Sequence, residues 1–367
     1  MHASEQMASA THEPPAPECV LRGHAADVTA ARFGSGGHWH DESGLPRLIS
    51  ASADGELRIW SLQTRRPVAK VAAHPDKSVL TVQSLAGGRV LTQGRDGFVH
   101  VWDAHEGEIR GPVLTLRSAS YNFCQCACNG TLATRWTGEA VEGEAAPLLA
   151  MANEDAQQVH IWDIRQPNAP AFVYAPSEAH GKAGMCMCTR FAQRGQLLLA
   201  GWEDGSLQCF DLRRFEGVGR PDESGVVKLH SEPLLCIEMG PTGQHALSGS
   251  ADCSLCVTPI AGGCLGKPDV KLQIPITNEA SGSGGIATVC MRPDGRVFAT
   301  GGWDRRVRIW QWRGHKPLAV LTQHTGTVNA VSFSDDSKWL ASASSDSTIA
   351  LWTLFPPKGK EEKPKGP

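Results

Sequence analysis

The stretch SASSDSTIALW (342–352) decides the fold of this chain, because its pattern returns at regular intervals along the sequence. Small residues come first, then an acidic residue at a turn, and then an alternating strand whose last position lies six residues after the acid. Five further copies keep this spacing, namely SASADGELRIW (50–60), TQGRDGFVHVW (92–102), AGWEDGSLQCF (200–210), SGSADCSLCVT (248–258) and TGGWDRRVRIW (300–310). A seventh copy, MANEDAQQVHIW (151–162), fits with one inserted residue. The pattern therefore predicts a sevenfold repeat.

Each copy is predicted to form a β-hairpin. Asp-Gly at 54–55, 96–97 and 204–205 tolerates the positive φ angles of a tight turn between two alternating strands. A histidine stands 22 residues before the Asp in three repeats, and a further apolar strand such as VNAVSFS (328–334) lies between them. A repeat of about four short strands is too small to be stable alone, so the repeats must stack on one another.

The repeats resemble the WD-repeat family, through Arg-Gly-His (22–24) at the start of the first and Val-Trp-Asp (101–103) and Ile-Trp-Asp (161–163) at the ends of the second and third. The resemblance extends over residues 18–355 and implies an all-β fold, a closed seven-bladed β-propeller. It also implies a buried hydrogen-bonded set in each repeat. The best-formed copy of this set would be His324, Ser342, Asp346 and Trp352. An indole N–H and a carboxylate can be buried only where each finds a partner.

Three repeats depart from this pattern. Repeat five ends in Thr258 in place of an aromatic residue, and repeats three and six lack the histidine. We expect these blades to be held more by packing than by the polar set.

The ends of the chain indicate how the ring closes. The last repeat ends at 352–354 without a fourth strand, while residues 18–22 precede the first repeat with nothing to pair with. We expect residues 18–22 to form the outer strand of the last blade, because this removes an open sheet edge. Residues 1–17, which are rich in Pro, and residues 356–367, rich in Lys and Pro, are expected to be disordered tails.

The composition is that of a folded protein that stays inside the cell. Hydrophobic residues make up 41% of the chain, charged residues 20%, and the net charge is −3, which argues against a protein that coats nucleic acid. No apolar run approaches the roughly 20 residues that span a bilayer, and the N-terminus lacks the apolar core of a signal peptide. The 12 cysteines are therefore interpreted as reduced, mostly buried thiols.

The sequence offers no catalytic motif, and we predict that the protein is not an enzyme. It has no nucleophile elbow, phosphate-binding loop or His-Glu-x-x-His helix. Cys253-x-x-Cys256 has no second pair of matching spacing, and the His-Trp-His-Asp group at 38–41 lies in a polar insertion. We therefore expect neither a metal nor a cofactor.

The strongest functional signal is a predicted binding rim. Propellers of this type present the hairpin turns and the loops that lead into each blade at one rim, so residues flanking the turn Asp should face partners. These residues are Arg95, Trp202, Glu203, Trp303, Arg305 and Arg306. Trp and Arg are the types that supply most binding energy in protein interfaces. The alternative is that Trp202 and Trp303 fold inward against the adjacent blade.

Several segments resemble one subfamily of WD-repeat proteins, the guanine-nucleotide-binding protein β-subunit-like proteins and their fungal ASTRA-associated counterparts. They include LLLAGWEDGSLQCFDL (197–212), the unusual Gly-Trp-Asp-Arg turn at 302–305 and the ending IALWTLFPP (349–357). The resemblance implies a non-enzymatic adaptor in the nucleus and cytoplasm. Its partners would be proteins of the co-chaperone machinery that matures phosphatidylinositol-3-kinase-related kinases, and of chromatin-linked ASTRA assemblies.

A second functional class rests on Trp-Asp-Ile-Arg (162–165), which resembles the W-D-x-R box of propellers that serve as substrate receptors of cullin-RING ubiquitin ligases. In that class Arg165, next to Asp163, would project from the blade to contact the ligase adaptor. A third possibility is a propeller that fills a structural position in a large assembly.

Overall fold

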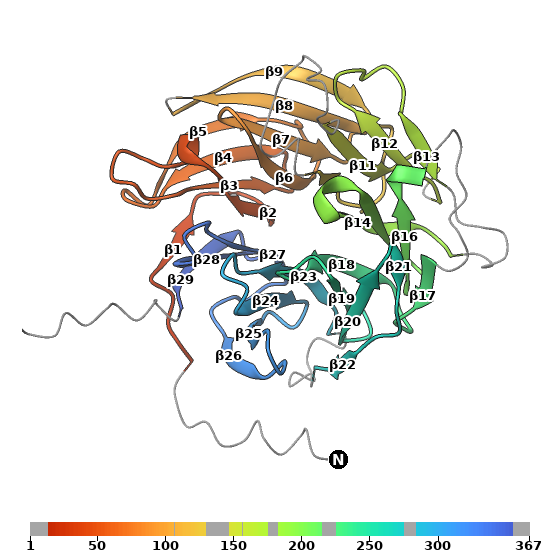
Figure 1. Ribbon diagram of the computed structural model, residues 1–367. Coiled ribbons are helices and arrows are strands. Elements are labelled where there is room, and N and C mark those ends of the chain that lie inside the picture. Colours follow the sequence, from red (N-terminus) through yellow and green to blue (C-terminus); the bar gives the residue numbers. More distant parts are fainter. Residues whose placement is uncertain are drawn as a thin grey trace, which may run out of the picture.

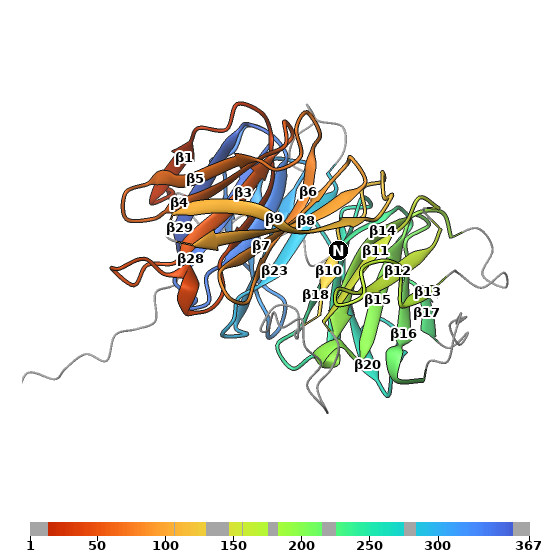
Figure 2. The same ribbon diagram turned by 90° about the horizontal axis from the view of Figure 1, so that it is seen from above.

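The computed structural model is a closed ring of seven antiparallel sheets, each radiating from a common axis (Figures 1 and 2). The structure describes residues 14–105, 107–129, 147–155, 157–174, 183–214, 225–274 and 284–354. The prediction of a seven-bladed β-propeller is therefore confirmed. Of the expected tails, residues 1–13 and 356–367 lie outside the described residues, as does residue 355, and Pro14–Pro17 form no regular element.

The blades follow the chain in order, and each runs from its inner to its outer strand. Blade one contains β2 (Val28–Phe33), β3 (Arg47–Ser52), β4 (Glu56–Ser61) and β5 (Arg66–Ala72). Blade two contains β6 (Val79–Leu85), β7 (Arg89–Gly94), β8 (Phe98–His105) and β9 (Glu108–Arg117). Blade three contains β10 (Ala127–Cys128), β11 (Leu148–Ala152), β12 (Val159–Asp163) and β13 (Phe172–Tyr174). Blade four contains β14 (Cys186–Ala192), β15 (Leu197–Trp202), β16 (Ser206–Asp211) and β17 (Val226–Lys228).

The second half of the ring repeats this order. Blade five contains β18 (Leu234–Met239), β19 (His245–Ser250), β20 (Ser254–Ala261) and β22 (Val270–Gln273), with β21 (Cys264–Leu265) beside β20. Blade six contains β23 (Ile286–Met291), β24 (Val297–Gly302), β25 (Val307–Gln311) and β26 (Pro317–Leu321). Blade seven contains β27 (Val328–Phe333), β28 (Trp339–Ser344), β29 (Thr348–Thr353) and β1 (Cys19–Arg22). Short 3₁₀ turns cover Gly37–Trp39, Gln193–Gly195 and Leu212–Arg214.

The ring is closed by β1, as the sequence predicts. This strand pairs antiparallel with β29, and Leu21 lies opposite Ile349. The inner strands of blades one and seven are joined as well, because the Asn329 side chain donates a hydrogen bond of 2.9 Å to the backbone oxygen of Val28. Blade seven is therefore made from both ends of the propeller, and neither β29 nor β2 is left as a free boundary.

The core consists of apolar layers between neighbouring blades. One layer joins blade seven to blade one, where Trp60 and Leu48 pack with Ala341 and Leu351. Side chains alternate along each strand, so one face of a sheet contacts the preceding blade and the other contacts the following blade. A single blade has no core of its own, which explains why the repeats fold only as a stack.

The buried set implied for the last repeat is present. His324 Nδ1 lies 3.0 Å from a carboxylate oxygen of Asp346, and its Nε2 lies 2.8 Å from the Ser342 hydroxyl. The Trp352 indole N–H donates to the same hydroxyl at 3.1 Å. The set therefore links the loop before the inner strand, the turn and the two central strands of the blade.

Blade six differs from the sequence-based expectation. It lacks the histidine, but the Arg308 guanidinium forms an ion pair with Asp304 at 2.6 Å, and both side chains are at least 93% buried. The Trp310 indole still donates to Thr300 at 3.0 Å. The expectation that packing replaces the polar set is wrong here, because an arginine from the strand supplies the cation that partners the turn Asp.

In the described parts of repeats five and three, by contrast, a hydrogen bond of the polar set is lost and not replaced. Thr258 is fully buried, and its hydroxyl has no partner among the described residues. The indole nitrogen of Trp162 in blade three also has no hydrogen-bond partner among the described residues.

In the described part of the chain, no helix is long and apolar enough to span a bilayer.

Candidate functional site

The hairpin turns lie at the end of the ring where the inner strands begin. In six of the blades the residue before the turn Asp donates a backbone hydrogen bond to a residue just ahead of the inner strand. Arg95 bonds Ser78 at 2.9 Å, Glu203 bonds Met185 at 2.8 Å and Trp303 bonds Gly285 at 2.9 Å. We call this end the turn rim, formed by the residues on either side of each turn Asp and by the loops that enter the inner strands. Arg95, Glu203 and Trp303 thus occupy one equivalent position in three blades, as predicted.

The same position is small in three other blades, where Ala53, Ala251 and Ser345 make the same backbone bond. A large side chain is therefore not needed to form the turn. The three blades with Arg, Glu and Trp present side chains whose reason must lie outside the hairpin.

Arg95 belongs to an exposed aromatic cluster that sequence reasoning missed. Its guanidinium carbon lies 4.4 Å from the centre of the Phe123 ring, a cation–π contact. Phe123 is 60% exposed and Tyr121 is 51% exposed, and the Tyr121 ring lies over Gly97 of the turn. Both aromatics precede inner strand β10. The signal that could have found them is position, because a loop entering an inner strand must lie at the turn rim.

Arg305 follows the turn Asp, a position that is glycine in blades one, two and four, Cys253 in blade five and Ser347 in blade seven. Its φ is 69°, and the equivalent Gly55, Gly97 and Gly205 also have positive φ. A non-glycine residue in this conformation costs about 1 kcal/mol or more. Arg305 and Arg306 are both half-exposed. The turn thus carries two cations on the rim, and its left-handed conformation is shared by Cys253 and Ser347.

Glu203 and Trp303 are held differently. Glu203 is exposed, and its carboxylate accepts the backbone N–H of Met185 at 3.0 Å, so it also steadies the loop before β14. Trp303 is half-buried and its indole packs against Gly285, where a Cβ would come within 2.7 Å of the ring. Part of the indole still faces solvent at the rim.

The prediction that Trp202 is a rim residue is wrong. Its side chain is 1% exposed and packs between blades three and four with Cys124 and Cys186. The position is two residues before the turn Asp, and the equivalent Ser52 and Ser344 are fully buried too. A shift of one residue along a strand reverses the side-chain direction, so Trp202 faces the core whereas Glu203 faces out.

Arg165, expected to project from its blade, is half-exposed and pairs with a residue of the same blade. Its guanidinium folds back onto Asp163, with Nε 2.9 Å from one carboxylate oxygen and Nη2 2.5 Å from the other. The same Asp-x-Arg pair recurs in blade four, where Arg213 bonds Asp211 at 2.9 and 2.7 Å. The box at 162–165 therefore encodes a local ion pair that this fold uses twice.

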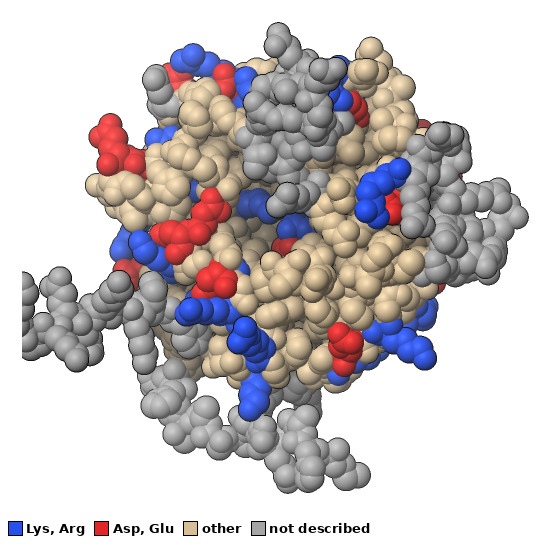
Figure 3. All heavy atoms as spheres, viewed as in Figure 1, with Lys and Arg blue, Asp and Glu red and all other residues tan. Residues whose placement is uncertain are grey.

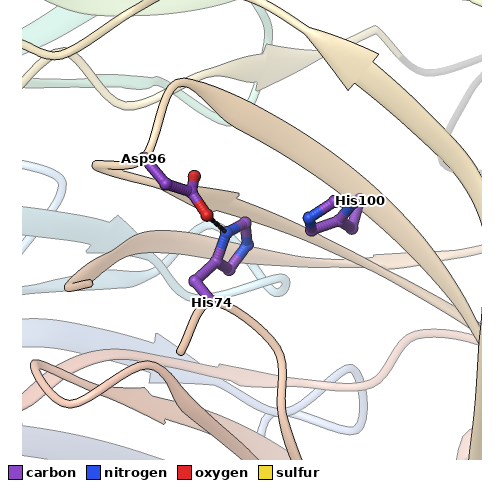
Figure 4. A group of neighbouring side chains, drawn as sticks. All are labelled: His74, Asp96 and His100. Carbon is purple, nitrogen blue, oxygen red and sulfur yellow. Dashed lines mark hydrogen bonds and ion pairs between the residues drawn. The ribbon is translucent and has the colours of Figure 1, made fainter. Parts of the chain in front are cut away.

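One group of side chains has the composition of a metal site, His74, Asp96 and His100, whose ligand atoms lie within 4.8 Å of one another (Figure 4). The nitrogens of His74 are already engaged, Nδ1 with Asp96 at 2.8 Å and Nε2 with the Thr92 hydroxyl at 2.9 Å. Trp102 donates to the same hydroxyl at 3.0 Å. A metal would have to break this set, so we assign the group to the structural network of blade two.

The group at 38–41 is likewise used by the fold. Trp39 is 1% exposed, and one carboxylate oxygen of Asp41 accepts the backbone N–H groups of Ser43 and Leu45, each at 3.0 Å. These contacts shape the insertion between β2 and β3.

The buried histidines predict that stability falls with acidification. Burial, and then the nearby Arg58, lower the pKa of His24 to about 4, whereas an unfolded histidine titrates near 6.5. Between these values the unfolded chain binds a proton that the folded chain does not, so the free energy of unfolding decreases as the pH falls from about 6.5 towards 4. One such histidine contributes at most about 1.4 kcal/mol per pH unit.

Urea denaturation at pH 7 and pH 5 checks this expectation. The variant His24→Gln should lose less stability on acidification than the wild type. An equal loss in both proteins would contradict the assignment of His24 as a neutral buried group.

Seven antiparallel blades, six of four strands and one of five, together with a His-Ser/Thr-Asp-Trp set and closure by the first strand define a WD-repeat β-propeller. The members of this class are typically non-enzymatic scaffolds for other proteins. The family model for the WD domain, G-beta repeat, matches residues 16–61, 223–258, 276–311 and 315–353. Guanine nucleotide-binding protein subunit beta-like protein 1 of Mus musculus is 33% identical over 356 residues, which cover 95% of this chain and 99% of that protein. The chain therefore belongs to the WD-repeat family that includes this mouse protein.

Fungal relatives extend the comparison. ASTRA-associated protein 1 of Verticillium alfalfae is 27% identical over 403 residues, covering 94% of each chain. ASTRA-associated protein 1 of Schizosaccharomyces pombe is 26% identical over 380 residues, covering 93% of this chain and 99% of that protein. The similarity therefore covers nearly the whole propeller.

Proposed function

We propose that this protein is a non-enzymatic adaptor of the co-chaperone and ASTRA machinery that matures phosphatidylinositol-3-kinase-related kinases, and that it works in the nucleus and cytoplasm. Support comes from the fungal relatives, whose name is ASTRA-associated protein 1 and which match along nearly the whole chain. The propeller itself provides a rigid ring with many exposed loops, the architecture of a scaffold.

The turn rim is the proposed partner surface. The observation that carries this proposal is the equivalent position before the turn Asp, where Arg95 and Trp303 replace the alanine of other blades. With Phe123, Tyr121 and Arg305 they place exposed or half-exposed aromatic and guanidinium groups on one end of the ring. A soluble propeller gains nothing from such residues at its turns, whereas an interface does.

The rim variants can be made without disturbing the fold, because other blades show which residue each position accepts. Trp303→Ala and Arg95→Ala copy Ala251 and Ala53, and Arg305→Gly copies the turn glycine of blade one. We expect all three variants to melt within a few degrees of the wild type. Trp303→Ala should weaken partner binding by about 2 kcal/mol or more, and the arginine variants should act more through association rate and salt dependence.

Affinity purification of the tagged protein with quantitative mass spectrometry gives the readout. Co-chaperone and kinase-maturation proteins should dominate the fraction bound to the wild type and be depleted by the rim variants. Variants of the outer strand β5, such as Arg66→Ala, serve as controls, since Arg66 is exposed far from the turns. A bound fraction dominated by a cullin adaptor, or one unchanged by the triple rim variant, would refute the proposal.

A further inference from the structure

A cavity of about 360 Å³ occupies the axis of the ring, lined by the inner strands of all seven blades. Figure 3 looks into this hollow from one end and shows basic side chains inside it.

One layer of the cavity contains a single residue from each blade. In every blade this residue of the inner strand pairs with the residue of the second strand that lies five positions before the turn Asp. We call this layer the collar, and its members are Arg32, Gln83, Ala127, Arg190, Glu238, Cys290 and Ser332.

The collar carries one cation that has no partner among the described residues. Arg190 and Glu238, from neighbouring blades, form an ion pair of 2.5 Å, and Glu238 is 8% exposed. Arg32 forms no side-chain hydrogen bond and no ion pair with any residue that the structure describes, although it is only partly exposed. The collar therefore has a net charge of +1, located at the guanidinium of Arg32.

Other polar side chains of the cavity have an evident structural use. Thr29 donates to the backbone oxygen of Val79 at 2.6 Å, and Thr189 donates to that of Gln125 at 3.2 Å. Both bonds join one inner strand to the next. Arg32 makes no such bond among the described residues, and holding an unpaired guanidinium in a narrow cavity costs solvation free energy. A bound anion would compensate for this loss of solvation free energy.

We propose that the collar binds a single carboxylate, presented by an acidic side chain of a partner peptide that enters the channel. A guanidinium accepts a carboxylate in a planar, two-bond arrangement. A phosphate dianion fits less well, because one free cation cannot neutralise it and Glu238 lies in the same layer. Only the origin of the carboxylate in a protein partner rests on the proposed function, since the anion site follows from the collar alone.

The charges at the two ends of the cavity favour entry of an acidic side chain from the turn rim. At the far mouth the exposed Asp335 accepts hydrogen bonds from the Ser35 hydroxyl at 2.7 Å and the Gly36 backbone at 3.2 Å, which places a negative charge there. At the rim mouth the described lining residues are uncharged. An acidic side chain that reaches the collar would therefore come from a partner seated on the rim.

Cys290 provides a reporter inside the collar. It lines the cavity and is partly exposed, and burial raises the pKa of its thiol to about 11. Iodoacetate and iodoacetamide have the same size, but only iodoacetate carries a carboxylate. In both cases the thiolate sulfur forms a bond to carbon, iodide leaves, and the thiol proton goes to solvent. The ratio of the iodoacetate rate to the iodoacetamide rate therefore measures the preference of the collar for an anion.

We expect this ratio at Cys290, relative to the exposed Cys264 of the same molecule, to fall on the order of tenfold in Arg32→Gln at low salt. Arg32→Lys should keep the rate ratio close to that of the wild type. Glu238→Gln should raise the rate ratio, because this change leaves the charge of Arg190 without a partner. Arg66→Gln, on the outer strand of blade one, is the matched control. Equal ratios in the wild type and Arg32→Gln would overturn the proposal.

Equilibrium binding provides a readout that needs no thiol. N-acetyl-glutamate amide should give a ligand-observed NMR signal with the wild type and slow the reaction of Cys290 with iodoacetamide, whereas N-acetyl-glutamine amide should do neither. Arg32→Gln should abolish both effects. If N-acetyl-phosphoserine amide binds more tightly than the glutamate compound, the site selects a dianion and the carboxylate proposal is wrong. No partner is present in these experiments, so their result is independent of the rim variants.

Discussion

Trp352→Ala is expected to lower the free energy of unfolding by about 3–5 kcal/mol, the usual cost of removing a buried aromatic side chain. Trp352 is 1% exposed and packs between blades six and seven with Val328 and Phe333. Its indole also donates to Ser342, which in turn contacts His324. The truncation therefore removes apolar packing from two blades and one bond from the buried set.

Two further variants separate these contributions. Trp352→Phe copies Phe210, which is 1% exposed at the equivalent position of blade four, so it should keep the packing and lose about 1 kcal/mol for the hydrogen bond. Asp346→Ala should cost about 1–3 kcal/mol, because His324 and the backbone N–H of Thr325 lose their acceptor. Urea denaturation measures all three. A Trp352→Ala protein that melts within two degrees or so of the wild type would show that the buried set is wrongly assigned.

Removal of residues 1–24 is expected to open the ring, whereas removal of residues 1–16 should leave its stability unchanged. The longer truncation deletes β1, whose backbone pairs with β29 and whose Leu21 is 2% exposed. Four lost backbone pairings and the loss of one buried leucine correspond to about 5 kcal/mol. The bare edge of β29 would also invite aggregation. The shorter truncation leaves β1 intact, and residues 14–16, the described part of what it removes, form no regular element.

A third truncation distinguishes the strand from the histidine that follows it. Removal of residues 1–22 keeps His24, which contacts the hydroxyls of Ser50 and Ser52 at 2.7 and 2.9 Å. We expect this shortened protein to be nearly as unstable as the 1–24 truncation, because closure depends on the strand. Differential scanning calorimetry and light scattering check the series. Equal melting temperatures for the 1–16 and 1–24 truncations would show that the ring closes in another way.

The proposed function divides between two parts of the molecule. The turn rim supplies aromatic and guanidinium groups over a broad surface, and the collar supplies the Arg32 cation, which has no partner among the described residues. A partner that places a loop on the rim and an acidic side chain in the channel would use both. The rim variants and the collar variants test these two contributions separately.

The fold and the position of the rim could be predicted from the sequence because both depend on local spacing. A fixed interval from turn Asp to strand end places Arg95, Glu203 and Trp303 at one equivalent position, and hairpin geometry follows from the residues of each turn. The family resemblance implied the buried set of the last repeat, and the missing fourth strand after that repeat indicated that residues 18–22 close the ring. These features repeat along the chain, so a one-dimensional pattern contains them.

Only the tertiary structure decided which side of the rim each side chain faces and what its neighbours are. Trp202 and Glu203 are adjacent in sequence, but the pleat sends the indole into the core and the carboxylate to solvent. In blade six Arg308 of β25 pairs with the turn Asp in place of the histidine that other blades carry in the loop before the inner strand, and no spacing rule reveals this. The collar unites Arg32 with Glu238 because ring closure brings inner strands from distant repeats around one axis. Contacts made by closure depend on the whole ring, and for this reason the sequence determined the blades while the structure determined the channel.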